Sequence, residues 1–156
     1  MDREGQDGTG RRDAGMTARE YLSQAYCLDQ RISSRIEQVE SLNDLARKAG
    51  CAISGMPRNP DRAVSSMANA VERIVDLQAE INADIERMVR LKAEIMAVVR
   101  QVEDPELQTL LEKRYLNFQT WGQIAADMGY NVRHLYRIHE RALLGVKVPE
   151  VVTGCH

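Results

Sequence analysis

The feature that most constrains this chain is a long stretch without glycine or proline, which runs from residue 61 to residue 104. Asn59-Pro60 precedes it, and an N-cap followed by proline in the first turn is typical of a helix start. Apolar side chains recur along it at steps of three and four residues, which predicts a long helix with coiled-coil character. At about 1.5 Å per residue such a helix spans about 60 Å, which is too long for a small compact domain and requires a partner. The seam residues that we assign to oligomerisation are Val71, Ile74, Ile81, Ile85, Met88, Ile95 and Val99.

A second helix is predicted ahead of this stretch. Thr17 and Glu20 have the spacing of a capping box, and apolar residues follow along one stripe. We expect Gly50 to end this helix and residues 50–59 to form a loop. Residues 17–103 then make a helical hairpin or coiled-coil oligomerisation region.

Two partners are open to the long helix. The preceding helix can fold back on it as an antiparallel hairpin, or the long helix can pair with its copy in another chain. Both hold in a four-helix bundle of two hairpins, which we favour because a second apolar stripe lies beside the seam. That stripe comprises Val75, Leu77, Val89, Leu91 and Val98. Gln78 and Lys92 interrupt the seam, either to fix its register or as ordinary rim residues.

The C-terminal part, residues 104–146, has the pattern of a small three-helix domain. Asp104-Pro105 repeats the cap-then-proline order and opens a helix that ends near Asn117 and Phe118. The side chains expected inside the domain are Leu110, Leu111, Tyr115, Trp121, Ile124, Leu135, Ile138 and Ala142, whereas His139 is expected to point away from them. The chain is therefore expected to be all-α, with a long antiparallel hairpin or coiled coil followed by a small trihelical domain.

Two short helices in this domain are joined by a tight glycine turn. Thr120 is a good N-cap with Gln123 three residues on, which is the spacing of a capping box. Gly129 can take the left-handed conformation that a sharp turn between helices requires. Asn131 can cap the next helix, which has a buried stripe and a basic outer face. This order is typical of a DNA-binding helix-turn-helix.

These residues resemble the helix-turn-helix of sigma factor region 4. The likeness is carried by Trp121, Ile124-Ala125, Met128-Gly129-Tyr130, Arg137-Ile138 and Ala142-Leu143, and by the preceding residues 110–116. The run from Met128 to Leu143 is also similar to small phage-encoded proteins of the ArpU-like family. The resemblance covers about the last third of the chain. It implies a phage-type transcriptional regulator with RNA polymerase as a further partner, and the lack of other sigma regions implies that it does not direct initiation alone.

Alignment with the region 4 pattern gives candidate DNA-binding residues. Val132, Arg133, Tyr136 and Arg137 would face the major groove, where arginine can bind guanine with two hydrogen bonds and valine can contact a thymine methyl group. His134 and Arg141 would meet phosphates. The alternative is that the arginines form a solvated helix face with partners four residues away.

Charge limits how tightly this chain can hold DNA. The net charge is −2, whereas DNA-coating proteins are usually basic. We therefore expect modest, salt-sensitive affinity for double-stranded DNA, which a homo-oligomer would strengthen. The near-neutral charge also leaves open another class of function, a phage structural, packaging or adaptor protein whose coiled coil mediates assembly.

Other classes of function find no support in the sequence. His134 and His139 are five residues apart, unlike the four-residue spacing of a helical zinc pair, and no nucleophile has a base beside it. We therefore expect no enzyme activity, metal or cofactor. Three scattered cysteines favour a reducing cytoplasm over a disulfide framework, and no apolar run approaches the length of a membrane span. Residues 1–16 and 147–156 are predicted to be tails, the first of them disordered.

Overall fold

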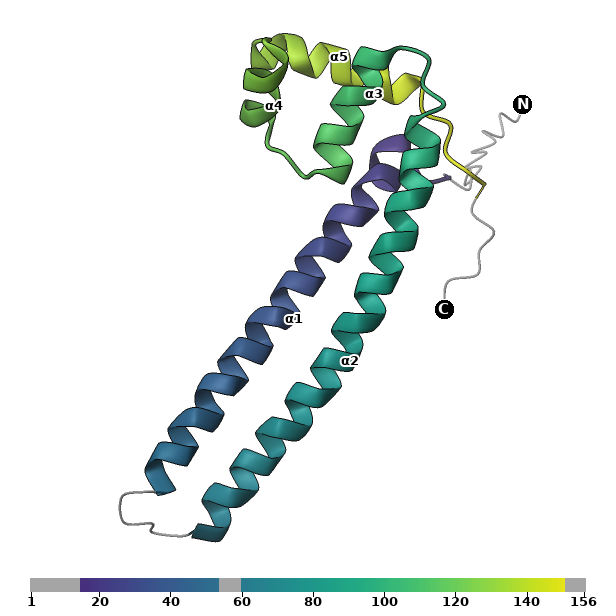
Figure 1. Ribbon diagram of the computed structural model, residues 1–156. Helices are drawn as coiled ribbons and strands as arrows, with labels where there is room; N and C mark the ends of the chain where they lie inside the picture. Colours follow the sequence, from purple (N-terminus) through teal and green to yellow (C-terminus); the bar gives the residue numbers. More distant parts are fainter. Residues whose placement is uncertain (1–14, 54–59, 151–156) are drawn as a thin grey trace, which may run out of the picture.

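The computed structural model describes residues 15–53 and 60–150, and every regular element within these ranges is helical (Figure 1). The helices α1 (Ala18–Ile53) and α2 (Pro60–Val99) form a long antiparallel hairpin. A smaller head follows, made of α3 (Pro105–Leu111), η1 (Glu112–Leu116), α4 (Trp121–Met128) and α5 (Val132–Leu144). The prediction of an all-α chain with a long hairpin and a small helical unit is confirmed. Most of the two predicted tails lies outside the described residues.

α1 begins where the sequence predicts and ends later. The backbone nitrogen of Thr17 donates to Glu20 Oε2 at 2.8 Å, and the backbone nitrogen of Glu20 donates to Thr17 Oγ1 at 3.2 Å, which completes the capping box. The expected end at Gly50 is wrong, because the helix continues through it to Ile53. Glycine inside a helix costs only about 1 kcal/mol relative to alanine, which is too little to end a helix by itself. Residues 50–53 of the predicted loop are therefore helical, and residues 54–59 lie outside the described residues.

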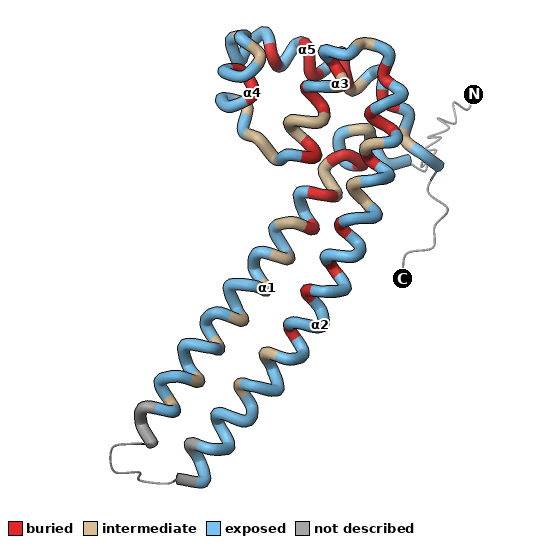
Figure 2. Tube along the Cα trace, viewed as in Figure 1, coloured by how far each residue is buried: buried red, intermediate tan, exposed pale blue. Residues whose placement is uncertain are grey.

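Burial is uneven along the hairpin (Figure 2). Leu22, Ala25 and Leu28 of α1 are buried against the part of α2 next to the head. In the far half, which comprises residues 29–50 and 61–76, no described side chain is buried. Two helices alone cover only one face of each other, so the far half of the hairpin remains largely open to solvent.

A charged cluster joins the two helices near the middle of the hairpin. Asp84 is buried on α2, and its carboxylate accepts hydrogen bonds from Arg31 at 2.6 and 3.1 Å and from Arg35. Arg35 also lies 3.3 Å from Glu80. Hydrogen bonds from Arg31 hold the pKa of Asp84 below its usual value, against the opposing effect of burial. The cluster fixes the register of α1 on α2.

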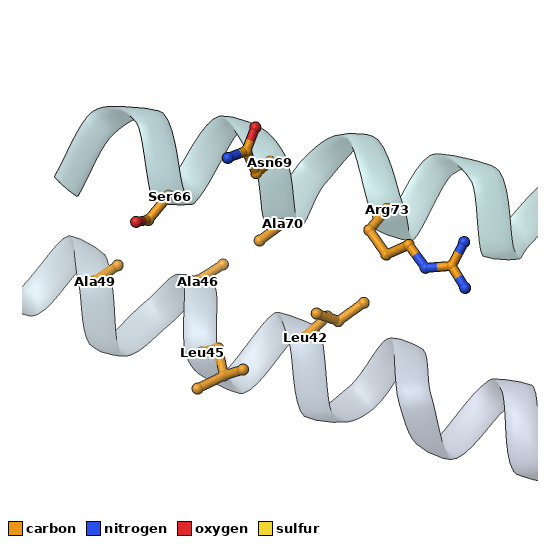
Figure 3. Close-up of a pocket in the computed structure, with 8 residues that line it drawn as sticks. All are labelled: Leu42, Leu45, Ala46, Ala49, Ser66, Asn69, Ala70 and Arg73. Carbon is orange, nitrogen blue, oxygen red and sulfur yellow. The ribbon is translucent and has the colours of Figure 1, made fainter. Parts of the chain in front are cut away.

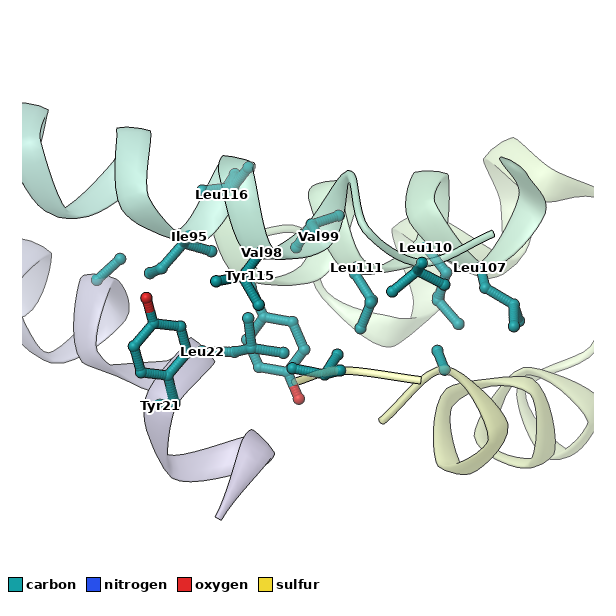
Figure 4. Packing of buried hydrophobic residues seen from close by; sticks show 14 of the residues in the cluster. Tyr21, Leu22, Ile95, Val98, Val99, Leu107, Leu110, Leu111, Tyr115 and Leu116 are labelled. Atoms are coloured by element: carbon teal, nitrogen blue, oxygen red, sulfur yellow. The ribbon is translucent and has the colours of Figure 1, made fainter. Parts of the chain in front are cut away.

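The head and the base of the hairpin share one hydrophobic core (Figure 4). Tyr21 and Leu22 of α1 and Ile95 of α2 belong to the same buried cluster as Leu110 and Tyr115 of the head. The predicted boundary between residues 103 and 104 therefore divides the sequence, but the hydrophobic core continues across it. This shared core fixes the head on the hairpin.

A wide turn ends the helix that the sequence predicts after Asp104. The Asp104 side chain caps α3 by accepting from the backbone nitrogen of Glu106 at 2.9 Å. The backbone nitrogen of Asn117 donates to the oxygen of Glu112, five residues earlier, so η1 is a π-helical turn. Phe118 follows with a φ of 55°, which ends the helix as predicted.

Leu116, at the end of this turn, and Phe118 also contact the C-terminal part of α2. Lys92 Nζ donates to the backbone oxygen of Leu116 at 3.0 Å and lies 4.6 Å from the centre of the Phe118 ring. Lys92 therefore joins α2 to the head. No helix in the described ranges is long and apolar enough to cross a lipid bilayer.

Candidate nucleic-acid interface

The turn between α4 and α5 is held by the caps that the sequence predicts. The backbone nitrogen of Gln123 donates to Thr120 Oγ1 at 3.3 Å, and that of Thr120 donates to Gln123 Oε1 at 2.9 Å. Gly129 has a φ of 71°, so it takes the left-handed conformation of a sharp turn. Asn131 Oδ1 accepts from the backbone nitrogen of His134 at 2.8 Å. Both helices of the motif therefore have defined starts.

The inner faces of the two helices bury the apolar side chains expected there. Ile124, Leu135 and Ala142 are fully buried, and Ile138 is 3 % exposed. Trp121 is half-buried, and its ring lies 5.1 Å from that of Tyr136 at an interplanar angle of 62°. This packing fixes how α5 is rotated about its own axis, and therefore which side chains it presents to solvent.

All six residues predicted to bind DNA lie on α5 and are exposed: Val132, Arg133, His134, Tyr136, Arg137 and Arg141. Two of them also rest on neighbouring aromatic rings. Tyr136 contacts Trp121 as described, and the His134 ring lies 4.9 Å from that of Tyr130. The other four extend from the helix into solvent.

Three arginines form a row along the outside of α5. Arg133, Arg137 and Arg141 are spaced four residues apart, so they lie on the same side of the helix. None of the ion pairs within the described residues involves any of the three. Like charges four residues apart on a helix destabilise it by about 0.2–0.5 kcal/mol a pair. An anionic partner would relieve this repulsion.

Glu140, which lies on the same helix as the three arginines, forms an ion pair with α1. Glu140 of α5 lies 2.6 Å from Nη2 of Arg19, which belongs to the first turn of α1. Glu140 is therefore drawn toward the hairpin and away from Arg137 and Arg141. No local pattern in the sequence indicates this contact, because its partners are 121 residues apart.

His139 is buried, and its expected outward orientation is wrong. Its Nε2 lies in hydrogen-bond contact with Tyr115 Oη at 2.7 Å, and its ring lies 4.7 Å from that of Trp121. Burial, and secondarily the charge of Arg19, lowers the pKa of His139 to about 4. Burial likewise raises the pKa of Tyr115 above its usual value. His139 stands four residues after Leu135 on the inner face, and this spacing was the signal in the sequence that could have placed it.

A small cleft of about 340 Å³ lies between the first turn of α1 and the head. It is lined by Arg19, Ser23, Arg114, Tyr115, Trp121, Tyr136, His139 and Glu140. Arg114 stacks over Trp121 at 4.7 Å from the ring and donates to the backbone oxygen of Gln119 at 3.0 Å. The charged side chains that line the cleft thus have partners within the chain, and we assign no ligand to it.

The described residues contain no group of three His, Cys, Asp or Glu side chains placed to hold a metal ion. Their arrangement instead combines a helix-turn-helix geometry with an exposed row of arginines.

Comparisons with protein-family models, with curated proteins and with solved structures found no match to this chain.

Proposed function

We propose that this protein is a sequence-specific DNA-binding transcriptional regulator of the phage type. The observation that carries the proposal is the row of Arg133, Arg137 and Arg141, which no carboxylate in the described chain neutralises, on the second helix of a capped helix-turn-helix. Arg133 and Arg137 would bind guanine edges in the major groove, while Val132 and Tyr136 contact bases beside them. His134 and Arg141 would hold phosphates.

The proposal is tested by selecting bound sequences from random double-stranded DNA and measuring affinity by fluorescence anisotropy at low salt. Arg133→Ala or Arg137→Ala should weaken binding to the selected sequence about 10- to 100-fold, because each bidentate pair contributes about 1–3 kcal/mol. Arg62→Ala removes the same charge from an exposed position at the far end of the hairpin and should have little effect. The proposal fails if no sequence is selected, or if all three variants bind like the wild type.

RNA polymerase is a further proposed partner, on the strength of the resemblance to sigma region 4. Purified polymerase and the full-length protein should co-elute in gel filtration if the two bind. A regulator of this kind works in the cytoplasm of a bacterial cell, in agreement with the sparse cysteines. A genome-wide binding profile would then give the operator and its genes.

A second candidate function is a structural or adaptor role in phage assembly. The observation that favours it is the far half of the hairpin, where apolar side chains such as Val64, Val71 and Val75 are exposed. In this role the hairpin would carry the activity and the head would serve for docking. Absence of any selected DNA sequence, together with stable association through the hairpin, would favour this role.

A further inference from the structure

An uncharged stripe runs along α2 on a side that the hairpin does not cover. Its eight positions alternate steps of four and three residues: Val64, Ala68, Val71, Val75, Gln78, Asn82, Ile85 and Val89. All eight are exposed, and the five large apolar side chains keep between 45 and 66 % of their surface in solvent. Regular steps of four and three residues are the heptad spacing of a coiled-coil seam. We call these eight positions the outer stripe.

The hairpin itself uses a different side of α2. Of the seven seam residues that the sequence assigned to oligomerisation, four are buried within the chain and a fifth is partly buried. These are Ile81, Met88, Ile95 and Val99, and the partly buried Ile74. The remaining two, Val71 and Ile85, belong to the outer stripe. The long apolar pattern of α2 therefore divides into an inner seam, which contacts α1 and the head, and an outer stripe.

The head closes the outer stripe at one end. Lys92 and Met96 continue its spacing beyond Val89. Lys92 is occupied by Leu116 and Phe118, and Met96 is partly buried against the core. The head thus covers the continuation of this stripe, whereas no described part of the chain covers the eight stripe positions from Val64 to Val89.

The side chains between the two helices become small at the far end of the hairpin. Ala46, Ala49 and Ala70 face one another there, and a groove of about 420 Å³ separates the helices beside them (Figure 3). Ser66, Asn69 and Arg73 complete the α2 side of the groove, and none of them belongs to the outer stripe. Because α1 buries so little of this half, pairing along the outer stripe would supply the apolar burial that it lacks.

We propose that the outer stripe pairs in parallel with the same stripe of a second copy of this chain. In this arrangement every apolar residue of the stripe meets its own copy, and the Asn82 side chains of the two copies face each other. A single asparagine at such a seam position fixes register and favours two strands in parallel coiled coils. Gln78 likewise meets its own copy, so both amides find polar partners.

An antiparallel pairing fits the same surface less well. Placing Gln78 opposite Asn82 of the second copy would preserve the polar match. That register brings Ala68 of one copy opposite Lys92 of the other, which Leu116 and Phe118 already contact, and Val64 opposite the partly buried Met96. In the parallel register residues 64–89 pair only with residues 64–89, and both heads lie at the same end of the dimer, beyond Val89. The inference stands without DNA binding, and its tests use no DNA.

The first test measures the mass of the full-length protein in solution by analytical ultracentrifugation. The wild type should have twice the 17.6 kDa of one chain at micromolar concentration. Val75→Glu should raise the dissociation constant on the order of 100-fold, because two facing carboxylates would be buried in the seam. Ala83→Glu places the same charge at another exposed position of α2 and should leave the dimer intact. A monomeric wild type, or a Val75→Glu variant that dimerises like the wild type with unchanged helicity, overturns the proposal.

The second test fixes the orientation. Cys27, Cys51 and Cys155 are replaced by serine, and Asn82→Cys is introduced as the single thiol. Parallel pairing in register places the two thiols opposite each other, so mild oxidation should yield a covalent dimer. Ala83→Cys in the same serine background, which lies off the stripe, should yield much less. Dimers that crosslink equally through both positions, or through neither, overturn the parallel register.

Discussion

Arg19 Nη2 lies 2.6 Å from Glu140 Oε1, and this ion pair ties the first turn of the hairpin to the middle of α5. Both side chains are largely exposed, so the pair contributes little to stability, on the order of 0.5 kcal/mol. The pair matters more for the charge of α5, because Arg19 neutralises Glu140, the one carboxylate of that helix. Arg137 and Arg141 lie within one turn of Glu140, and no ion pair among the described residues involves either of them.

Loss of this ion pair should weaken DNA binding without unfolding the head. In Arg19→Ala the Glu140 carboxylate is released beside the arginine row, where it competes with phosphates. We expect affinity for selected DNA to fall about 3- to 10-fold at low salt and the loss to shrink as salt is added. Anisotropy titrations would measure this, and chemical unfolding should show a change within about 1 kcal/mol.

The double variant Arg19→Ala/Glu140→Gln provides the control. It removes both charges of the pair, so affinity should return to the wild-type value or exceed it. If the double variant binds as weakly as Arg19→Ala, Arg19 itself contacts DNA and the explanation through Glu140 is wrong.

Gly129→Ala should destabilise the head through its backbone alone. A Cβ built at Gly129 meets no atom within 4 Å, but its φ of 71° is in the left-handed region. We therefore expect a loss of about 1 kcal/mol in the free energy of unfolding, measured in urea. Gly122→Ala is the matched control, since Gly122 lies inside α4 and the new Cβ would only touch Thr120 Oγ1 at 4.0 Å. That variant should gain about 0.5–1 kcal/mol, so the two changes should have opposite signs.

The sequence was sufficient for features set by local chemistry. The helix caps and the sharp turn lie where the sequence predicts them, because a cap depends on residues only a few positions away. The caps are Thr17, Asp104, Thr120 and Asn131, and the turn is at Gly129. The presence and order of the helices followed from the same signals.

Features set by distant packing were not predictable in this way. The burial of His139 depends on Tyr115 and Trp121, which the chain brings against it. The Arg19–Glu140 pair joins the two ends of the chain. Likewise, the division of the α2 pattern into an inner seam and an outer stripe became visible only once α1 and the head were in place. The six residues predicted to bind DNA are exposed on α5, and their role stays a prediction.

Asp84→Asn should destabilise the hairpin by about 1–3 kcal/mol, because it removes a charged acceptor that Arg31 and Arg35 share. The pKa of Asp84 is lowered in the folded state, so its contribution is present above the pKa of the unfolded chain, about 3.9. It is lost as pH falls through the lower folded value. The difference between wild type and variant in urea unfolding should therefore be constant near neutral pH and shrink below about pH 4. Asp76→Asn, at an exposed position of α2, should show neither effect.

His139 should make the stability of the head depend on pH between about 6.5 and 4. Its pKa is lowered to about 4 in the folded protein, whereas an unfolded histidine has a pKa of about 6.5. Below pH 6.5 the unfolded chain binds a proton that the folded chain does not, so the free energy of unfolding should decrease as pH falls across this window.

Two variants separate the charge of His139 from its hydrogen bond. His139→Phe keeps an aromatic ring against Trp121 and removes the titrating group. The free energy of unfolding should therefore decrease less between pH 6.5 and 4 than in the wild type, as measured by urea unfolding followed by circular dichroism. Tyr115→Phe removes the hydrogen bond at 2.7 Å but leaves the imidazole buried. It should lower stability at every pH, by about 1–3 kcal/mol, and keep the slope. A slope that persists in His139→Phe would assign the pH dependence to other groups, and a slope lost in Tyr115→Phe would mean that the imidazole is no longer held in the core.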